Sequence, residues 1–210
     1  MNKLITLISL LITLSFNTFA QDDAVDDPRG AIAFIETISQ ETIAAWSDSK
    51  LTKAERAAAF RAIFEEATDI DLLARGMLGR HYRTVTSEQR SAYMAAMQDY
   101  IVTEFDKRME QIGFKTLDVI GTKPASGKRG HLFVRTEVKR SEGEPILADW
   151  RVRKKNGAFH IVNLEFEGIN LMITNRDLFA AKVKSDGIEG LIEWLKSQSS
   201  SEKPGGSTKS

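Results

Sequence analysis

The hydrophobic periodicity of this chain changes at Gly113, and that change constrains its fold more than any other feature. Before Gly113, apolar side chains recur every three or four residues, as on one face of a helix: Tyr93, Met97, Ile101, Phe105, Met109 and Ile112. After Gly113, apolar and polar side chains alternate, which is typical of strands with one buried face. The sequence therefore predicts helices first and a sheet afterwards, in one α+β domain.

Signals for helix ends predict four helices before the sheet and two after it. Asp27-Pro28 and the capping boxes Thr52-Lys53-Ala54-Glu55 and Thr86-Ser87-Glu88-Gln89 are typical helix starts, and Gly113 is a typical stop. The expected helices run from Pro28 to about Trp46, from Thr52 past Phe64, from Ile70 to Leu78, from Thr86 to about Ile112, from Thr174 to about Lys184, and from Gly187 to about Ser197.

Alternation predicts about four strands in meander order. The first lies around Phe114 to Ile120, and the last two flank the hairpin signal Lys155-Asn156-Gly157. The side chains expected to point inward from the other strands are Leu132, Val134, Thr136, Val138, Ala148, Trp150, Val152, Val162, Leu164 and Phe166. We therefore expect an antiparallel, twisted sheet packed against the helices.

Residues 1–20 have the pattern of a secretory signal peptide. Lys3 is followed by an apolar run from Leu4 to Phe16 and by small residues before a cut after Ala20. As a helix, the apolar run is too short for a bilayer core of about 30 Å. We expect an exported protein with one domain over residues 21–198 and a disordered tail over 199–210, which has no apolar residue.

Composition excludes several function classes. The chain has no cysteine, so an exported domain must rely on its core instead of disulfides. Lys and Arg number 29, as do Asp and Glu, and loss of Lys3 with the signal leaves 28 against 29. This balance argues against nucleic acid as a partner. The three histidines, His81, His131 and His160, lack metal-ligand spacing, so we expect no metal.

Three groups of residues occur in the order of a known family. Asp69 to Arg83 follows the pattern D-x-x-x-x-A-x-x-x-L-G-x-x-W/Y-R, and Thr86 to Arg90 is T-x-E-Q-R. The last third has a Trp-containing strand pair, Glu167-Gly168-Ile169-Asn170-Leu171, and then R-x-x-F and G-I-x-G-L-I-x-x-L helices. The stretch from about residue 32 to 195 thus resembles the MlaC-like family of periplasmic lipid-binding proteins, also called toluene-tolerance auxiliary proteins.

The resemblance implies a periplasmic phospholipid carrier. Relatives of this kind carry phospholipid between an outer-membrane lipoprotein-porin complex and an inner-membrane ABC lipid transporter, with no cofactor besides the cargo. Such a carrier would hold acyl chains in an apolar cavity between sheet and helices, and we expect a monomer. Met77, Met94, Met97, Met109 and Met172 fit such a cavity, because methionine adapts to irregular apolar shapes. The pattern alone favours ordinary core filling, and it is the resemblance that favours the cavity.

Two sets of residues are candidates for lipid contact under this hypothesis. The cavity wall would combine the sheet's inner face with the stripe of the long helix: Tyr93, Met97, Ile101, Phe105, Val134, Trp150, Val152, Val162, Leu164 and Phe166. Arg80, Arg83 and Arg176 are candidates for the mouth, because guanidinium groups suit phosphate oxygens. For Arg176 we favour a structural role, in which it pairs with Asp177 or Glu167.

Three alternatives remain open at this stage. The cargo could be a hopanoid or another envelope lipid. An enzyme with a cone-shaped α+β pocket could use Asp149 or Asp118 with Tyr93 or Tyr100 for acid-base chemistry, although no spacing requires it. A ligand-free envelope adaptor is the third.

Overall fold

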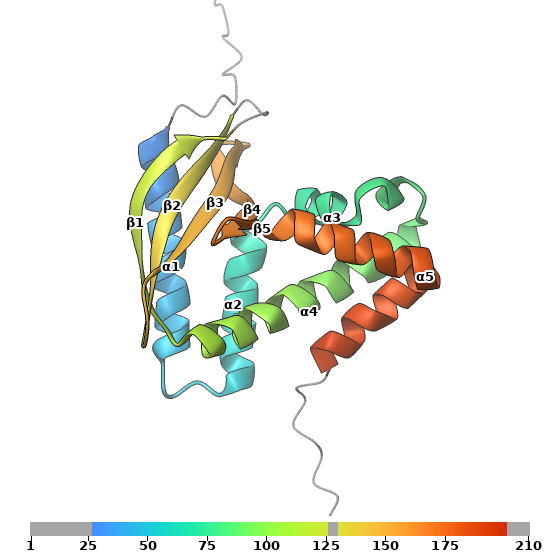
Figure 1. The fold of residues 1–210 in the computed structure, drawn as a ribbon, viewed down its shortest axis with the longest axis horizontal. Coiled ribbons are helices and arrows are strands. Elements are labelled where there is room, and N and C mark those ends of the chain that lie inside the picture. The colour runs from blue at the N-terminus through green and yellow to red at the C-terminus, as the bar shows by residue number, and fades with distance from the viewer. Residues whose placement is uncertain (1–26, 126–129, 201–210) are drawn as a thin grey trace, which may run out of the picture.

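The computed structural model describes residues 27–125 and 130–200 (Figure 1). Its elements are α1 (Pro28–Ser47), α2 (Lys53–Ala67), α3 (Ile70–Leu78), the 3-10 helix η1 (Gly79–Arg83), α4 (Ser87–Ile112), β1 (Phe114–Pro124), β2 (His131–Arg140), β3 (Ile146–Lys155), β4 (Ala158–Phe166), β5 (Ile169–Asn170) and α5 (Leu171–Ser200). The expected signal peptide and residues 201–210 of the expected tail lie outside the described residues. Ser199 and Ser200 belong to α5.

The first four helices start where the sequence predicts. Both capping boxes form: Thr52 exchanges hydrogen bonds with Glu55 before α2, and Thr86 does so with Gln89 before α4. The Asp27 carboxylate accepts a 2.8 Å hydrogen bond from the Gly30 amide at the start of α1. These side chains satisfy amide groups that have no partner inside the helix, which fixes each boundary.

The sheet is antiparallel, in the order β1-β2-β3-β4-β5, as the meander prediction requires. The short strand β5 was not predicted. It follows a tight turn in which Glu167 and Gly168 both have positive φ, 50° and 77°, a conformation that favours glycine at the second position. In Figure 1 the sheet curves, and α1 lies against its inner face.

A β-bulge in β4 interrupts the predicted alternation of side chains. Arg151 is opposite Asn163, but its neighbour Val152 is opposite Ile161, so Val162 is an extra residue in the ladder. The predicted alternation assumed an unbroken period of two, which a bulge interrupts. Phe159 and Ile161 therefore take the inward position next to Val152, beside α1.

The two predicted C-terminal helices are arms of one longer element, α5. Gly187 has φ 71° and ψ −177°, which is not helical, and α5 turns sharply there (Figure 1). The first arm begins at Leu171, three residues before the predicted start. The second arm carries Leu191, Ile192 and Leu195, which are buried against α3 and α4.

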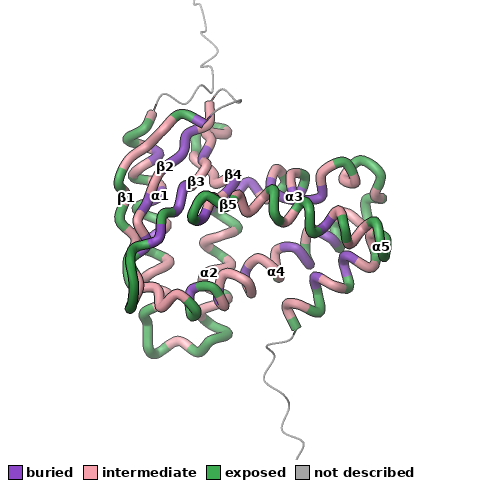
Figure 2. The backbone as a smooth tube through the Cα atoms, viewed as in Figure 1, coloured by how far each residue is buried: buried purple, intermediate pink, exposed green. Residues whose placement is uncertain are grey.

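Buried side chains form three clusters, and Figure 2 marks the buried residues along the chain. The first joins α3, α4 and α5 around Tyr93 and Phe179. The second joins α1 to the inner face of β2 and β3, and the third lies at the other end of the sheet around Val138 and Phe166. The space among the three clusters is the candidate site.

Candidate functional site

A cavity of about 320 Å³ lies between the inner face of the sheet and the helices. Its walls come from the C-terminal half of α1, one face each of α2 and α4, parts of α3, the inner face of the sheet, and the first two turns of α5. Most of the lining side chains are apolar. The volume is at the lower end of the range for small-molecule sites, about 300–1,000 Å³.

The helices contribute flexible methionine side chains to the cavity wall, whereas the sheet contributes a tryptophan held by a hydrogen bond. Met77, Met109 and Met172 line it, and Phe60 of α2 stacks on Phe105 of α4 with ring centroids 3.7 Å apart. On the sheet, the Trp150 indole N–H donates a 3.0 Å hydrogen bond to the Thr136 hydroxyl. This bond satisfies the one polar atom of the indole side chain, so that its ring can face an apolar ligand without an unpaired group.

Several polar side chains line the cavity on α4, β4 and α5. Arg108 is exposed there, with its guanidinium carbon 5.4 Å from the centre of the Phe166 ring. Glu104 lines the cavity one turn earlier and pairs with Lys107 at 3.2 Å. Asn163 accepts a 3.2 Å hydrogen bond from the Met172 amide. The edge of the cavity thus has one cation, Arg108, that forms no ion pair with a carboxylate of the described residues.

The structure brings half of the ten predicted wall residues together. Ile101, Phe105, Trp150, Leu164 and Phe166 line the cavity. Tyr93 and Met97 pack instead in the cluster of α3, α4 and α5, where the Tyr93 hydroxyl donates to the Ala74 carbonyl. Val134 and Val152 pack against α1, and Val162 is the bulge residue. The apolar stripe of α4 thus faces a buried cluster in its first half and the cavity further along. The uniform spacing of its apolar residues does not distinguish these two environments.

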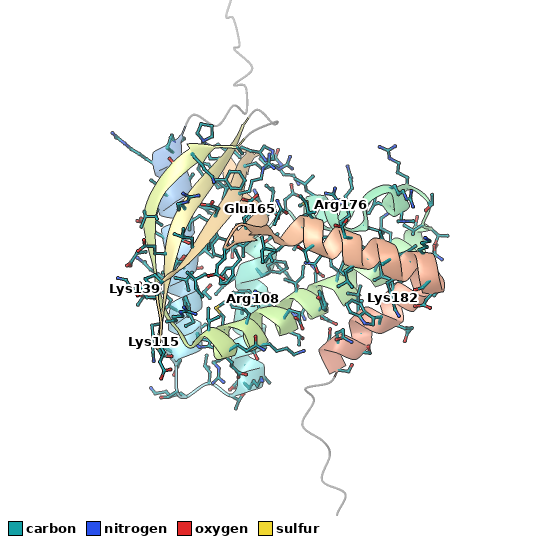
Figure 3. All side chains as sticks on the ribbon, viewed as in Figure 1. Arg108, Lys115, Lys139, Glu165, Arg176 and Lys182 are labelled. Atoms are coloured by element: carbon teal, nitrogen blue, oxygen red, sulfur yellow. The ribbon has the colours of Figure 1, made fainter. Side chains whose placement is uncertain are left out.

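The three predicted mouth arginines lie elsewhere. Arg80, Arg83 and Arg176 line a second cleft, which shares no lining residue with the cavity. Figure 3 shows Arg176 on the side of α5 that faces α3, and Arg108 on the other side, between α4 and the sheet. Arg176 does hold elements together, but with a different partner from those expected: its Nε donates a 2.8 Å hydrogen bond to the Gly76 carbonyl.

Sequence reasoning missed the contribution of α2 and α3 to the cavity. Phe60, Ile63 and Phe64 of α2 line it, together with Leu73 and Met77 of α3. Their spacing of three and four residues marks an apolar face, but that pattern does not say whether a face meets a cavity or a core. Arg108 was missed because it lies between Phe105 and Met109 on α4, where it does not change the spacing of the apolar positions.

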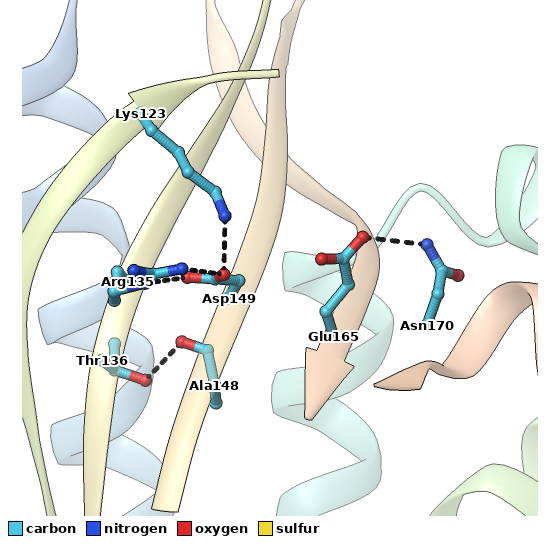
Figure 4. A network of polar contacts seen from close by, with 7 residues as sticks. All are labelled: Lys123, Arg135, Thr136, Ala148, Asp149, Glu165 and Asn170. Atoms are coloured by element: carbon cyan, nitrogen blue, oxygen red, sulfur yellow. Dashed lines mark hydrogen bonds and ion pairs between the residues drawn. The ribbon is translucent and has the colours of Figure 1, made fainter. Parts of the chain in front are cut away.

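The acid-tyrosine pairs considered for an enzyme do not form. Asp149 lies on the opposite face of the sheet from Trp150, where it accepts hydrogen bonds from Arg135 and Lys123 (Figure 4). The Arg135 guanidinium, with Lys123, holds the pKa of Asp149 below its usual range against the effect of burial. Asp118 pairs with Lys139, and burial raises the pKa of Tyr93. Only Tyr100 of the four residues lines the cavity.

The described ranges, 27–125 and 130–200, contain neither a metal cluster nor a membrane-spanning helix. No group of three or more potential metal-ligating side chains occurs in them. No helix in these ranges combines the length and the apolar character needed to cross a membrane.

Comparisons with known proteins relate this architecture to one family. The family model described as MlaC protein matches residues 36–197. A solved structure with a similar fold is that of a phospholipid-binding protein from Ralstonia solanacearum in complex with a phospholipid. Its TM-score is 0.68 at 20% sequence identity, and the match covers 80% of this chain and 96% of that chain.

Proposed function

Because this chain belongs to the MlaC protein family, we propose that it is a phospholipid carrier whose acyl chains occupy the cavity between sheet and helices. The observation that carries the proposal is the cavity itself, which is mostly apolar and is bordered by a cation, Arg108, that has no ion pair with a described carboxylate. The fold it shares with the Ralstonia solanacearum phospholipid-binding protein supports the same function. The resemblance found in the sequence predicted this family.

The chemistry of the cavity suits acyl chains better than a polar substrate. Burial of each methylene is worth about 0.8 kcal/mol, so two sixteen-carbon tails represent on the order of 20–25 kcal/mol before the costs of binding. Methionine side chains in the wall can follow chains of different length and unsaturation. Release of such a ligand into water would be very slow. A carrier of this kind would therefore transfer its lipid while docked to a membrane complex.

Arg108 is the proposed contact for the lipid headgroup. A phosphate is costly to bury without partners, so the headgroup should remain at the polar edge. Arg108 is exposed at that edge and lies over Phe166, so its guanidinium can bind phosphate while its stem covers apolar wall. Arg108 thus takes the headgroup role that was expected of Arg80, Arg83 and Arg176, whose cleft is separate from the cavity.

We place the carrier in the periplasm, with the outer-membrane lipoprotein-porin complex and the inner-membrane ABC transporter as its partners. This part of the proposal rests on membership of the family and on the signal-like pattern of residues 1–20. Lipid binding by this chain would contribute to outer-membrane lipid asymmetry and solvent tolerance.

Native mass spectrometry of protein purified from a periplasmic extract without detergent tests the proposal. We expect a stoichiometric mass excess that extracts as phospholipid. Extraction of a hopanoid would change the cargo and leave the carrier mechanism in place. A protein that is empty and takes up no lipid from vesicles would contradict the carrier function.

Cavity-filling variants test the position of the cargo. Leu164→Trp and Ile101→Trp would fill the cavity from its sheet and helix sides, and Ile120→Trp adds the same side chain at an exposed position of β1. Loss of contact with two methylenes costs about 1.6 kcal/mol, which is more than tenfold in affinity. We expect the first two variants to remain folded and to lose lipid, while Ile120→Trp retains it. Full lipid content in folded Leu164→Trp and Ile101→Trp would place the cargo elsewhere.

A further inference from the structure

A second hollow of about 530 Å³ lies on the other side of α3 and α5 from the cavity. It is formed by the end of α3, η1, the start of α4 and the first arm of α5. Five arginines and one tyrosine supply its side chains: Arg75, Arg80, Tyr82, Arg83, Arg90 and Arg176. We refer to these residues as the arginine cleft. Met172 packs against Gly76 between the cleft and the cavity, which keeps the two apart.

The fold holds several of these side chains in defined positions. The Tyr82 ring has the guanidinium carbons of Arg75 and Arg90 at 5.3 Å and 4.6 Å from its centre. Arg90 also donates a 3.4 Å hydrogen bond to the Tyr82 carbonyl, and Arg176 is fixed by its bond to Gly76. Arg80 and Arg83, on η1, are exposed at the rim. The cleft is therefore largely preorganised, which lowers the cost of binding a ligand.

The charge of the arginine cleft is not compensated within the described part of the chain. None of its five guanidinium groups forms an ion pair with a described carboxylate. Elsewhere in the protein, by contrast, the carboxylates of Asp69 and Asp149 each form ion pairs with two cations. The Nε of Arg90 is buried and has no hydrogen-bond partner among the described residues. Five like charges in one hollow repel one another, so an anion bound there would be stabilised.

The chemistry of the lining indicates which anion the cleft would bind. All of its cations are arginines, whose planar guanidinium groups match the oxygens of phosphate in pairs, whereas lysine acts as a point charge. We propose that the arginine cleft is a binding site for a phosphate group, distinct from the lipid cavity and independent of the proposed cargo. That phosphate belongs either to the headgroup of an anionic lipid at a membrane surface or to a free phosphate compound.

Two probes distinguish these sources. Binding of inorganic pyrophosphate by calorimetry reports a free phosphate ligand, and co-sedimentation with phosphatidylglycerol vesicles reports headgroups at a surface. We expect the full chain to bind at least one probe, more weakly as salt is raised, because exposed charges are screened. Binding of pyrophosphate alone, of vesicles alone or of both supports the site and identifies the source. Failure to bind either probe at low salt overturns it.

The variant that tests the site is Arg80→Gln with Arg83→Gln. Both side chains are exposed on η1 and form no ion pair with the described residues, so the fold should tolerate the change. The matched control is Lys50→Gln with Lys115→Gln, which removes the same charge from exposed positions outside the cleft. We expect probe binding to weaken about tenfold or more in the first variant, since each basic residue contributes to attraction by an anionic surface. The control should bind like the natural chain.

Lipid content of the same variants separates this proposal from the carrier function. Because the cleft and the cavity share no lining residue, we expect the arginine variant to retain its lipid in native mass spectrometry. An equal loss of probe binding in both double variants would show nonspecific charge attraction and overturn the site. Loss of lipid with unchanged probe binding would equally overturn it, since Arg80 and Arg83 would then act on the cargo.

Discussion

Arg108 shows how one side chain can mark the border between an apolar wall and water. It lies one turn after Phe105 on α4, but unlike Phe105 it is exposed and covers Phe166 with its guanidinium group. No hydrogen bond or ion pair to a described residue holds Arg108 in place. A ligand phosphate is therefore the partner that its position best fits, and its removal should cost the fold little.

Arg108→Gln should weaken retention of phospholipid without unfolding the protein. A hydrogen bond to a charged group contributes about 1.5–3 kcal/mol, which corresponds to roughly ten- to a hundredfold in affinity. Exchange of labelled lipid from the loaded protein into excess vesicles measures this. Lys115→Gln, at an exposed position away from the cavity, is the control. Equal exchange rates for the two variants would place the headgroup away from Arg108.

At the scale of single elements, the break at Gly187 decides how α5 packs. A straight helix of this length would carry its second half away from the bundle, whereas the break returns Leu191, Ile192 and Leu195 to the cluster around Tyr93. Sequence reasoning predicted a boundary at Gly187, because a helix signal starts there. It could not predict the direction of the second arm, which depends on contacts with α4.

Gly187→Ala should therefore destabilise the protein although nothing lies within 4 Å of the added methyl group. The backbone conformation at φ 71° and ψ −177° is one that residues with a Cβ rarely adopt, and such strain costs of order 1–3 kcal/mol. Lys184→Ala, in the preceding turn, should change stability by less than about 0.5 kcal/mol. Urea unfolding of both variants measures the difference. Equal midpoints would show that the break does not require glycine.

At the scale of the whole molecule, most elements were predictable but the placement of the cavity among them was not. Capping boxes and alternation specify local structure, and the meander order follows from short connections. Whether Ile101 and Met97, one turn apart on α4, meet a cavity or a core depends on where α2, α3 and α5 lie. That information comes from long-range packing, which periodicity does not contain.

Asp69 connects the helical part of the molecule to the sheet. Its carboxylate caps α3 through the Leu72 amide and pairs with Arg153 and Lys155 of β3. Burial opposes ionisation of Asp69, but the bonds from Arg153, Leu72 and Lys155 outweigh it and leave the pKa below its usual range. Asp149 has a lowered pKa for the related reason of its bonds to Arg135 and Lys123. Both carboxylates therefore stabilise the fold in their ionised form.

The sign of the pH dependence follows from these lowered values. A carboxyl group with a lower pKa in the folded state gives its full stabilisation above its unfolded pKa, about 3.9 for aspartate. That stabilisation is lost as pH falls through the folded pKa. We expect the free energy of unfolding to decrease below about pH 4.

Asp69→Asn should lower stability at pH 7 by about 1–3 kcal/mol and flatten the dependence below pH 4, because asparagine can keep the cap but not the ion pairs. Urea unfolding from pH 7 to pH 3 measures both effects. Asp118→Asn provides the control, since its pair with Lys139 is exposed and should contribute little. If Asp69→Asn lost stability with acid as steeply as the natural chain, the contact between α3 and β3 would not be a source of the acid sensitivity.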